Sequence, residues 1–212
     1  MVNNIDKSLW NARTIEEIKK MLKQGADVNA RYGDGCTLLH YVKDAQIAKV
    51  LIDAGADVNA KNIYGATPLH IVRSSEIAKL LINAGADIGA KGISMFSGMP
   101  LHYARDEKIA KVLIDAGADA KAEDVDGRTP LHYVRCVEVA MLLIETGANV
   151  NAKDVFGATP LHYARDEKIA KVLIENGADV KAKDTDGETA LDYAKNYERF
   201  DVVQVIEKAL NK

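Results

Sequence analysis

The feature that most constrains this chain is an internal repeat of about 30 residues. A Gly-Ala pair ends six apolar stretches, with its glycine at positions 25, 55, 85, 117, 147 and 177, so the steps are 30, 30, 32, 30 and 30 residues. The fifteen residues PLHYARDEKIAKVLI occur without a difference at 100–114 and at 160–174, two steps apart. A catalytic site gains nothing from duplication, whereas a stacked structural unit requires it. The repeat therefore predicts an array of similar units.

One repeat, residues 157–183, shows the pattern of two helices and a turn. Thr159 is a good N-cap residue and is followed by proline, so we expect a short first helix over residues 161–165. The second helix should carry its apolar stripe at Ile169, Val172, Leu173 and Asn176, spaced i, i+3, i+4 and i+7. Gly177 then supplies the positive φ that ends it. A helix pair this small cannot bury its apolar faces alone, so neighbouring units must stack against it.

The repeated motifs resemble those of a known family. The stretches DGRTPLHYV at 126–134, GATPLHYA at 157–164 and LLINAGADIGAK at 80–91 are similar to the ankyrin repeat, whose signature is T-P-L-H-x-A with a period near 33 residues. Here the turn between LHYA and IAKVLI is about three residues shorter than the family's, which accounts for the shorter step. The resemblance implies an all-α solenoid of helix-turn-helix units with β-hairpin-like finger loops. It also implies a concave surface, lined by fingers and first helices, that binds another protein.

The two ends of the chain differ from the repeat, as expected of capping units. Near the N-terminus, Thr14 and Glu17 form the sequence of a capping box that should open a helix running through Gln24. Near the C-terminus, Ala190 and Asp192 replace the proline and histidine of the motif, and the last unit regains about three residues. We expect one continuous solenoid domain. Its parts are a degenerate N-terminal cap at 1–30, tandem repeats at 31–186 and a C-terminal capping repeat at 187–212.

Composition excludes several classes of protein. The chain has 212 residues, is 48% hydrophobic, and carries 28 Lys and Arg against 31 Asp and Glu, so a net charge of -3 gives no overall attraction to nucleic acid or anionic lipid. The first ten residues contain no apolar run typical of a secretory signal, and no later stretch is long enough to span a bilayer. We therefore expect a cytoplasmic protein without a disulfide between its two cysteines. Export by a route that reads no N-terminal signal stays open.

All five histidines occupy the same repeat position, which raises the question of a metal site or proton relay. They are His40, His70, His102, His132 and His162. Successive histidines lie one repeat apart, too far to share a zinc ion whose ligand bonds are near 2 Å. The family resemblance implies structural hydrogen bonds for them instead. With no histidine free to activate a serine or cysteine, and no glycine-rich phosphate loop, we expect no enzyme activity, no metal and no cofactor.

Every repeat has a cation three residues after the histidine position. This basic column comprises Lys43, Arg73, Arg105, Arg135, Arg165 and Lys195. One interpretation is structural, because a cation at the end of a short helix complements its dipole, and Asp44, Asp106 and Asp166 beside it can neutralise the charge. The other is a ladder for an acidic partner, strongest at Arg73 and Arg135. A related alternative function is the binding of an anionic ligand, either nucleic acid or a phosphorylated metabolite, along the column.

A second column directly follows the histidine and is mostly aromatic. Its members are Tyr41, Ile71, Tyr103, Tyr133, Tyr163 and Tyr193. We expect most of this aromatic surface to pack between units. The alternative is a stack of tyrosines that faces a partner.

The turns of the fingers give the sharper functional signal. Where two units have Asp126 or Asp186 before the turn glycine, others have the large apolar pairs Ile63-Tyr64 and Val155-Phe156. The third finger is two residues longer and carries Ile93, Met95 and Phe96. One interpretation is that this insertion is tolerated and folds back on its neighbour. The other is a patch of apolar anchors for a partner.

These patterns predict a non-enzymatic module that binds another protein. The expected partner-binding residues are Ile63, Tyr64, Ile93, Met95, Phe96, Val155, Phe156, Arg73 and Arg135. We expect a monomer that binds no membrane, with nucleic acid the less favoured partner. Self-association through the finger tips is a third hypothesis.

Overall fold

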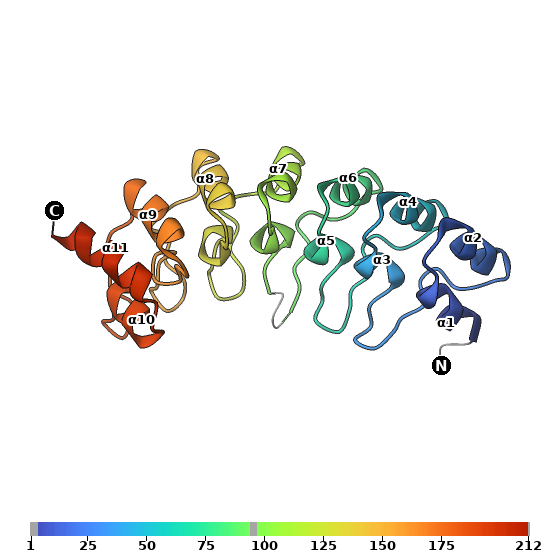
Figure 1. Cartoon of the computed structure of the whole chain (residues 1–212), viewed down its shortest axis with the longest axis horizontal. Coiled ribbons are helices and arrows are strands. Elements are labelled where there is room, and N and C mark those ends of the chain that lie inside the picture. The colour runs from blue at the N-terminus through green and yellow to red at the C-terminus, as the bar shows by residue number, and fades with distance from the viewer. Residues whose placement is uncertain (1–3, 94–96, 212) are drawn as a thin grey trace. The chain divides into compact units, whose positions relative to one another are not determined.

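The computed structural model describes residues 4–93 and 97–211, which fold into two compact units, Met1–Pro100 and Leu101–Lys212. Within each unit the longer helices form one row, the short helices a second row, and the hairpin-like fingers extend beyond the short helices (Figure 1). The two units are built from the same repeat and are described here one at a time.

Unit 1, Met1–Pro100, contains two cap helices and two repeats. Its helices are α1 (Asn4–Asn11), α2 (Ile15–Lys23), α3 (Leu38–Tyr41), α4 (Ala45–Asp53), α5 (Pro68–Ile71) and α6 (Ser75–Asn83). The predicted capping box is confirmed, because the Thr14 side chain accepts from the Glu17 amide while Glu17 accepts from the Thr14 amide. Helix α1 was not predicted from the sequence.

Unit 2, Leu101–Lys212, contains three repeats and the final capping pair. Its elements are the 3-10 helices η2 (Pro100–Tyr103) and η3 (Pro130–Tyr133), and the α-helices α7 (Glu107–Asp115), α8 (Val137–Glu145), α9 (Glu167–Glu175), α10 (Ala190–Asn196) and α11 (Phe200–Leu210). Across residues 4–93 and 97–211 no β-strand forms, and the bridges Tyr32–Cys36 and Lys183–Thr189 are isolated. The described residues thus have the predicted all-α architecture.

The first helix of each repeat is shorter than predicted. Residues 160–163 form turns rather than the helix expected over 161–165, and the equivalent segments elsewhere span only four residues. The shortened connection is the physical reason. Directly after the short helix the backbone must become extended to reach the next helix, as it does at Val134 (ψ 141°). In the last unit, which has three more residues, α10 extends to seven residues.

The core of each unit comes from one stripe of the longer helices. In α9 the buried side chains are Ile169, Ala170 and Leu173, whereas Val172 is half-buried and the predicted stripe residue Asn176 is exposed as the C-cap. The equivalent leucines Leu51, Leu81, Leu113, Leu143 and Leu173 are all fully buried. Burial of each such side chain stabilises the fold by about 1.5–3 kcal/mol.

The histidines join each short helix to the finger of the next repeat. In unit 1 the Thr37 amide donates to His40 Nδ1 at 3.1 Å, so the imidazole carries its proton on Nε2, which donates to the Ala66 carbonyl at 3.1 Å. In unit 2 His132 makes the equivalent contact with the Ala158 carbonyl at 3.3 Å. These hydrogen bonds confirm the structural role expected of the histidines. They hold neighbouring fingers in register.

Candidate functional site

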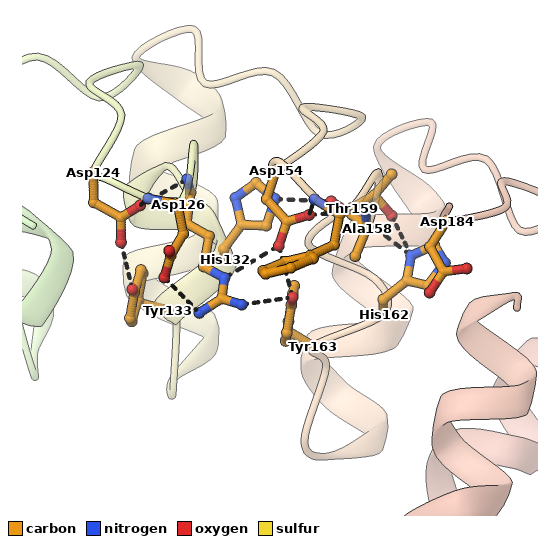
Figure 2. A network of polar contacts seen from close by, with 12 residues as sticks. Asp124, Asp126, His132, Tyr133, Asp154, Ala158, Thr159, His162, Tyr163 and Asp184 are labelled. Carbon is orange, nitrogen blue, oxygen red and sulfur yellow. Dashed lines mark hydrogen bonds and ion pairs between the residues drawn. The ribbon is translucent and has the colours of Figure 1, made fainter. Parts of the chain in front are cut away.

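The fingers are tight turns closed by a side chain at their base. In unit 2 Asp154 Oδ1 accepts hydrogen bonds from the Phe156 and Ala158 amides, both at 3.0 Å (Figure 2). Asn62, Asp124 and Asp184 make the same pair of contacts in their own fingers. These two hydrogen bonds tie the base of each finger to its turn, so each tip has a defined conformation.

Backbone hydrogen bonds connect one fingertip to the next within each unit. In unit 1 the Ile63 amide donates to the Asp34 carbonyl at 2.9 Å, and the Ile93 amide to the Tyr64 carbonyl at 2.8 Å. In unit 2 the Val155 amide donates to the Asp126 carbonyl at 2.9 Å. A Cβ added at Gly65 would lie 2.9 Å from the Ile93 nitrogen, so this turn glycine lets the fingers approach closely.

The apolar tip residues predicted from the sequence project into solvent where the structure describes them. The side chains of Ile63, Ile93 and Val155 are each 60% exposed, Phe156 is 50% exposed and Tyr64 is half-buried. The predicted residues Met95 and Phe96 lie outside the described residues. Each unit therefore presents adjacent apolar tips, Ile63 and Ile93 in unit 1 and Val125 and Val155 in unit 2.

The expected partner-binding residues do not include Val125, which is 69% exposed. It lies two residues before the turn glycine Gly127, as Ile63 lies two residues before Gly65. Counting from that glycine would have placed Ile63, Val125 and Val155 at one structural position.

Arg128 organises the tips of unit 2. Its Nε donates to Asp154 Oδ2 at 3.1 Å and its second terminal nitrogen to the Tyr163 hydroxyl at 3.0 Å. The guanidinium carbon lies 5.8 Å from the Phe156 ring centroid and 4.9 Å from that of Tyr163. Burial opposes the charge, but the hydrogen bond to Asp154 and the interactions with Tyr163 and Tyr133 together outweigh burial and raise the pKa of Arg128. The exposed Phe156 ring is therefore held against a permanently charged, anchored arginine.

The tyrosine column fixes the base of the unit 2 fingers. Tyr133 donates to Asp124 at 2.5 Å and Tyr163 to Asp154 at 2.7 Å (Figure 2). Tyr193 donates in the same way to Asp184 at 2.9 Å. Tyr103 and Tyr133, with ring centroids 5.7 Å apart, confirm the predicted packing between neighbouring repeats, as do Tyr163 and Tyr193 at 6.2 Å. Tyr41 is the exception, with 48% of its surface exposed at the end of the array, where no complete repeat precedes it.

Comparison with known proteins agrees with this geometry. A model of the family described as ankyrin repeats (3 copies) matches residues 10–92, 101–184 and 138–211. The chain belongs to the ankyrin repeat family. No match was found among curated protein sequences.

Two solved ankyrin repeat domains illustrate the shared fold. The human ASB11 ankyrin repeat domain is 25% identical, with a TM-score of 0.79, over 98% of this chain and 97% of that one. The ankyrin repeat domain of Bcl-3, described as a unique member of the IkappaB protein family, is 23% identical, with a TM-score of 0.68, over 97% of this chain and 98% of that one. Ankyrin repeat domains are in general modules of protein–protein interaction and are typically non-enzymatic.

The basic column of this ankyrin protein is exposed at all six positions. Lys195 forms an ion pair with Glu207 at 3.5 Å, whereas the other five cations make no ion pair with any residue in the described ranges. The aspartates expected to neutralise them are used differently. Asp106 accepts from the Ile109 amide at 2.9 Å and Asp166 from the Ile169 amide at 3.0 Å, so both cap the following helix.

Neither a membrane span nor a metal centre is found in the parts of the chain that the structure describes. Within residues 4–93 and 97–211 no helix has the length and apolar character needed to cross a bilayer. The same residues contain no group of three or more His, Cys, Asp or Glu side chains placed to hold a metal ion.

Proposed function

We propose that this ankyrin repeat protein binds another protein through its finger tips, with a contribution from the basic column. The observation that carries the proposal is the repetition of an exposed aliphatic side chain at one position of successive fingers. Ile63 and Ile93 form this surface in unit 1, and Val125 and Val155 form it in unit 2. Turns that serve only as connections are normally polar, so large apolar residues at four tips favour a contact surface.

The hydrogen bonds between tips make this surface suited to binding. Because each tip is bonded to its neighbour, few rotatable groups have to be ordered when a partner docks. Burial of a large apolar side chain contributes about 1.5–3 kcal/mol before the costs of association. Two or three such contacts per unit, together with the cations Arg73 and Arg135 of the basic column, are the proposed sources of binding free energy.

Phe156 is the proposed anchor of unit 2. Aromatic and arginine side chains that are well packed and centrally placed carry much of the binding energy in protein interfaces. Phe156 is half-exposed, and Arg128 is fixed beside it by Asp154 and Tyr163. Tyr64 takes the corresponding position in unit 1, and Met95 and Phe96 belong to the proposal on the strength of their sequence alone.

Quantitative affinity capture from a lysate of the native cell tests the proposal. The baits are the wild type, a unit 1 variant with Ile63→Asp and Ile93→Asp, and a unit 2 variant with Val155→Asp and Phe156→Asp. Met141→Asp is the matched control, because Met141 is an exposed apolar residue on α8, far along its repeat from the tip. We expect a protein retained by the wild type and the control and lost from at least one tip variant. Equal retention by all four baits would show that the tips are not the binding surface.

The alternative function is binding of an anionic ligand along the basic column. One observation favours it, since Lys43, Arg73, Arg105, Arg135 and Arg165 are exposed and make no ion pair in the described part of the chain. Binding of a polyanion should weaken steeply as salt rises, whereas binding through apolar tips should not. Titration of a single-stranded oligonucleotide at two salt concentrations distinguishes the two functions.

A further inference from the structure

The first finger, residues 31–36, departs from the pattern of the other fingers. At the base position, where Asn62, Asp124, Asp154 and Asp184 each accept two backbone hydrogen bonds, this finger has Tyr32. Asp34 supplies a single weaker contact in their place, accepting from the Cys36 amide at 3.3 Å. The turn then depends on two glycines with positive φ, Gly33 and Gly35. A position that gives up local stability is a candidate for a functional role.

Tyr32 takes part in an aromatic cluster instead. Its ring stacks on Trp10 with centroids 4.4 Å apart, and Trp10 meets Tyr41 edge to face at 5.9 Å. The Tyr32 hydroxyl is buried, yet it makes no hydrogen bond to any atom of the described residues. Burial is the main cause of the raised pKa of Tyr32, so its ring stays neutral. The cluster therefore offers aromatic surface and no positive charge.

A shallow hollow of about 560 Å³, widely open to solvent, lies at this cluster. It is lined by Trp10, Tyr32, Gly33, Asp34 and Tyr41. Asp34 is the one charged residue of this lining. Burial acts to raise its pKa, but hydrogen bonds from Cys36 and from the Tyr41 hydroxyl (3.2 Å) outweigh burial and lower it. At neutral pH the hollow thus combines three aromatic rings with one carboxylate.

The nearest cations do not occupy this hollow. The Arg31 guanidinium donates to the carbonyls of Gly35 and Lys61. Arg13 and Lys43 line an adjoining hollow, which shares Trp10 and Tyr41, and the Arg13 guanidinium donates to the Trp10 carbonyl at 3.2 Å. The carboxylate of Asp34 accepts hydrogen bonds but forms no ion pair with a described residue.

We propose that this hollow binds a methylated ammonium group, as a free quaternary amine or as a methylated lysine side chain. Aromatic faces attract cations, and the attraction is largest when the cation leaves water easily. A methylated ammonium does so, whereas the unmethylated ammonium of lysine is compact and strongly hydrated. Asp34 adds charge complementarity and disfavours anionic ligands. This site adjoins the finger-tip surface, since the Asp34 carbonyl accepts from the Ile63 amide, but binding of a cation here does not depend on that surface.

Trp10 allows a direct test, because it is the only tryptophan in the chain and its fluorescence reports on the hollow. The probes are choline and 3,3-dimethylbutan-1-ol, a neutral molecule of nearly the same shape. We expect choline to change the Trp10 emission with a dissociation constant on the order of 1 mM, at least about tenfold tighter than the alcohol. Equal responses to the two probes, or none to choline, would overturn the proposal.

Substitutions sharpen the test and guard against misfolding. Asp34→Asn keeps the acceptor for the Cys36 amide but removes the charge, so choline binding should weaken about tenfold. Asp57→Asn is the control, since Asp57 is an exposed carboxylate of the same unit that accepts a backbone amide in the same way. Unchanged choline affinity in Asp34→Asn, or an equal loss in both variants, would contradict the role of Asp34.

Tyr32→Asn restores the base residue of the other fingers and separates binding from folding. We expect it to abolish the choline response while the protein keeps a cooperative thermal transition, because the turn regains its side-chain hydrogen bonds as the contact of Tyr32 with Trp10 is lost. A variant that still binds choline like the wild type would overturn the proposal. Comparison of choline with acetylated trimethyl-lysine amide distinguishes the two sources of the cation. Tighter binding of choline indicates a free amine, and tighter binding of the lysine derivative indicates a modified side chain.

Discussion

Each unit has a core of equivalent leucines, but the two units differ at the base of their fingers. In unit 2 each described finger has an aspartate at its base that also accepts the hydroxyl of the tyrosine nine residues later. In unit 1 the equivalent base positions are Tyr32, Asn62 and Gly92, and no described finger has that aspartate–tyrosine pair. The buried leucines are the same in both units. The repeat thus keeps the packing constant while the base and tip of each finger vary, and this is where specificity can arise.

The largest expected difference between the units is at the base aspartate of unit 2. Asp154→Ala removes two turn hydrogen bonds, takes one carboxylate partner from the partly buried Arg128, which keeps Asp126 at 3.5 Å, and leaves the Tyr163 hydroxyl without its acceptor. It should therefore reduce the free energy of unfolding by about 3 kcal/mol. Asn62→Ala removes the turn bonds of unit 1 and should cost about 1–2 kcal/mol. Urea titrations of both variants measure the difference. A loss in Asp154→Ala no greater than in Asn62→Ala would mean that the arginine cluster adds no stability.

The close approach of neighbouring tips gives the next largest effect. Gly65→Ala places a Cβ 2.9 Å from the Ile93 nitrogen and forces alanine to φ +71°, so we expect a loss of about 2–3 kcal/mol. Gly25→Ala is the matched control, with φ +89° but no atom within 4 Å, and should lose only about 1 kcal/mol. Thermal unfolding measures both. Equal losses would show that the tip contact is not tight.

Acidification should destabilise both units through their histidines. The loss of unfolding free energy at each histidine should be smaller than the loss caused by removing a side chain. Burial lowers the pKa of His40, His132 and His162 below the ordinary value of 6.5, so the unfolded chain binds more protons than the folded one at mildly acidic pH. Stability should therefore be complete above about pH 6.5 and fall as the pH decreases below it. Thermal midpoints between pH 7.5 and 5 measure this trend. A midpoint that stays constant or rises on acidification would contradict it.

The smallest effect concerns the cap of α8. Asp106 and Asp166 cap the equivalent helices in unit 2, whereas the Cys136 side chain forms no capping hydrogen bond. Cys136→Asp should therefore stabilise the protein by about 1 kcal/mol, and Asp166→Cys should destabilise it by a similar amount. Urea titration of the pair is the measurement. Two variants with wild-type midpoints would show that this cap is energetically unimportant.

Local patterns predicted most of the fold, because the repeat is short and its signals lie within one unit. The spacing of Ile169 and Leu173 located a buried helix face, and Thr14 with Glu17 located a cap. The length of the first helices could not be read from Thr159 and its proline alone, since the short connection after them decides where they end. Helix α1 has no repeat motif, and its contribution depends on packing against the first repeat.

The candidate sites were predictable only in part. The apolar tips stand out as residues of an unusual type in a turn. Arg128 does not, because its contacts with Asp154 and Tyr163 join residues 26 and 35 positions apart. The cluster of Trp10, Tyr32 and Tyr41 likewise depends on α1 folding against the first finger. Contacts at such separations follow from how the units stack and not from the sequence pattern around each residue.

The most direct test of the account is photo-crosslinking at a finger tip. A photoreactive phenylalanine analogue placed at Phe156 should form a covalent adduct with a specific protein in the native cell, and the same analogue at Met141 should not. That result would show that the tip touches its partner. No adduct from Phe156, or the same adducts from both positions, would contradict the claim that the finger tips are the binding surface.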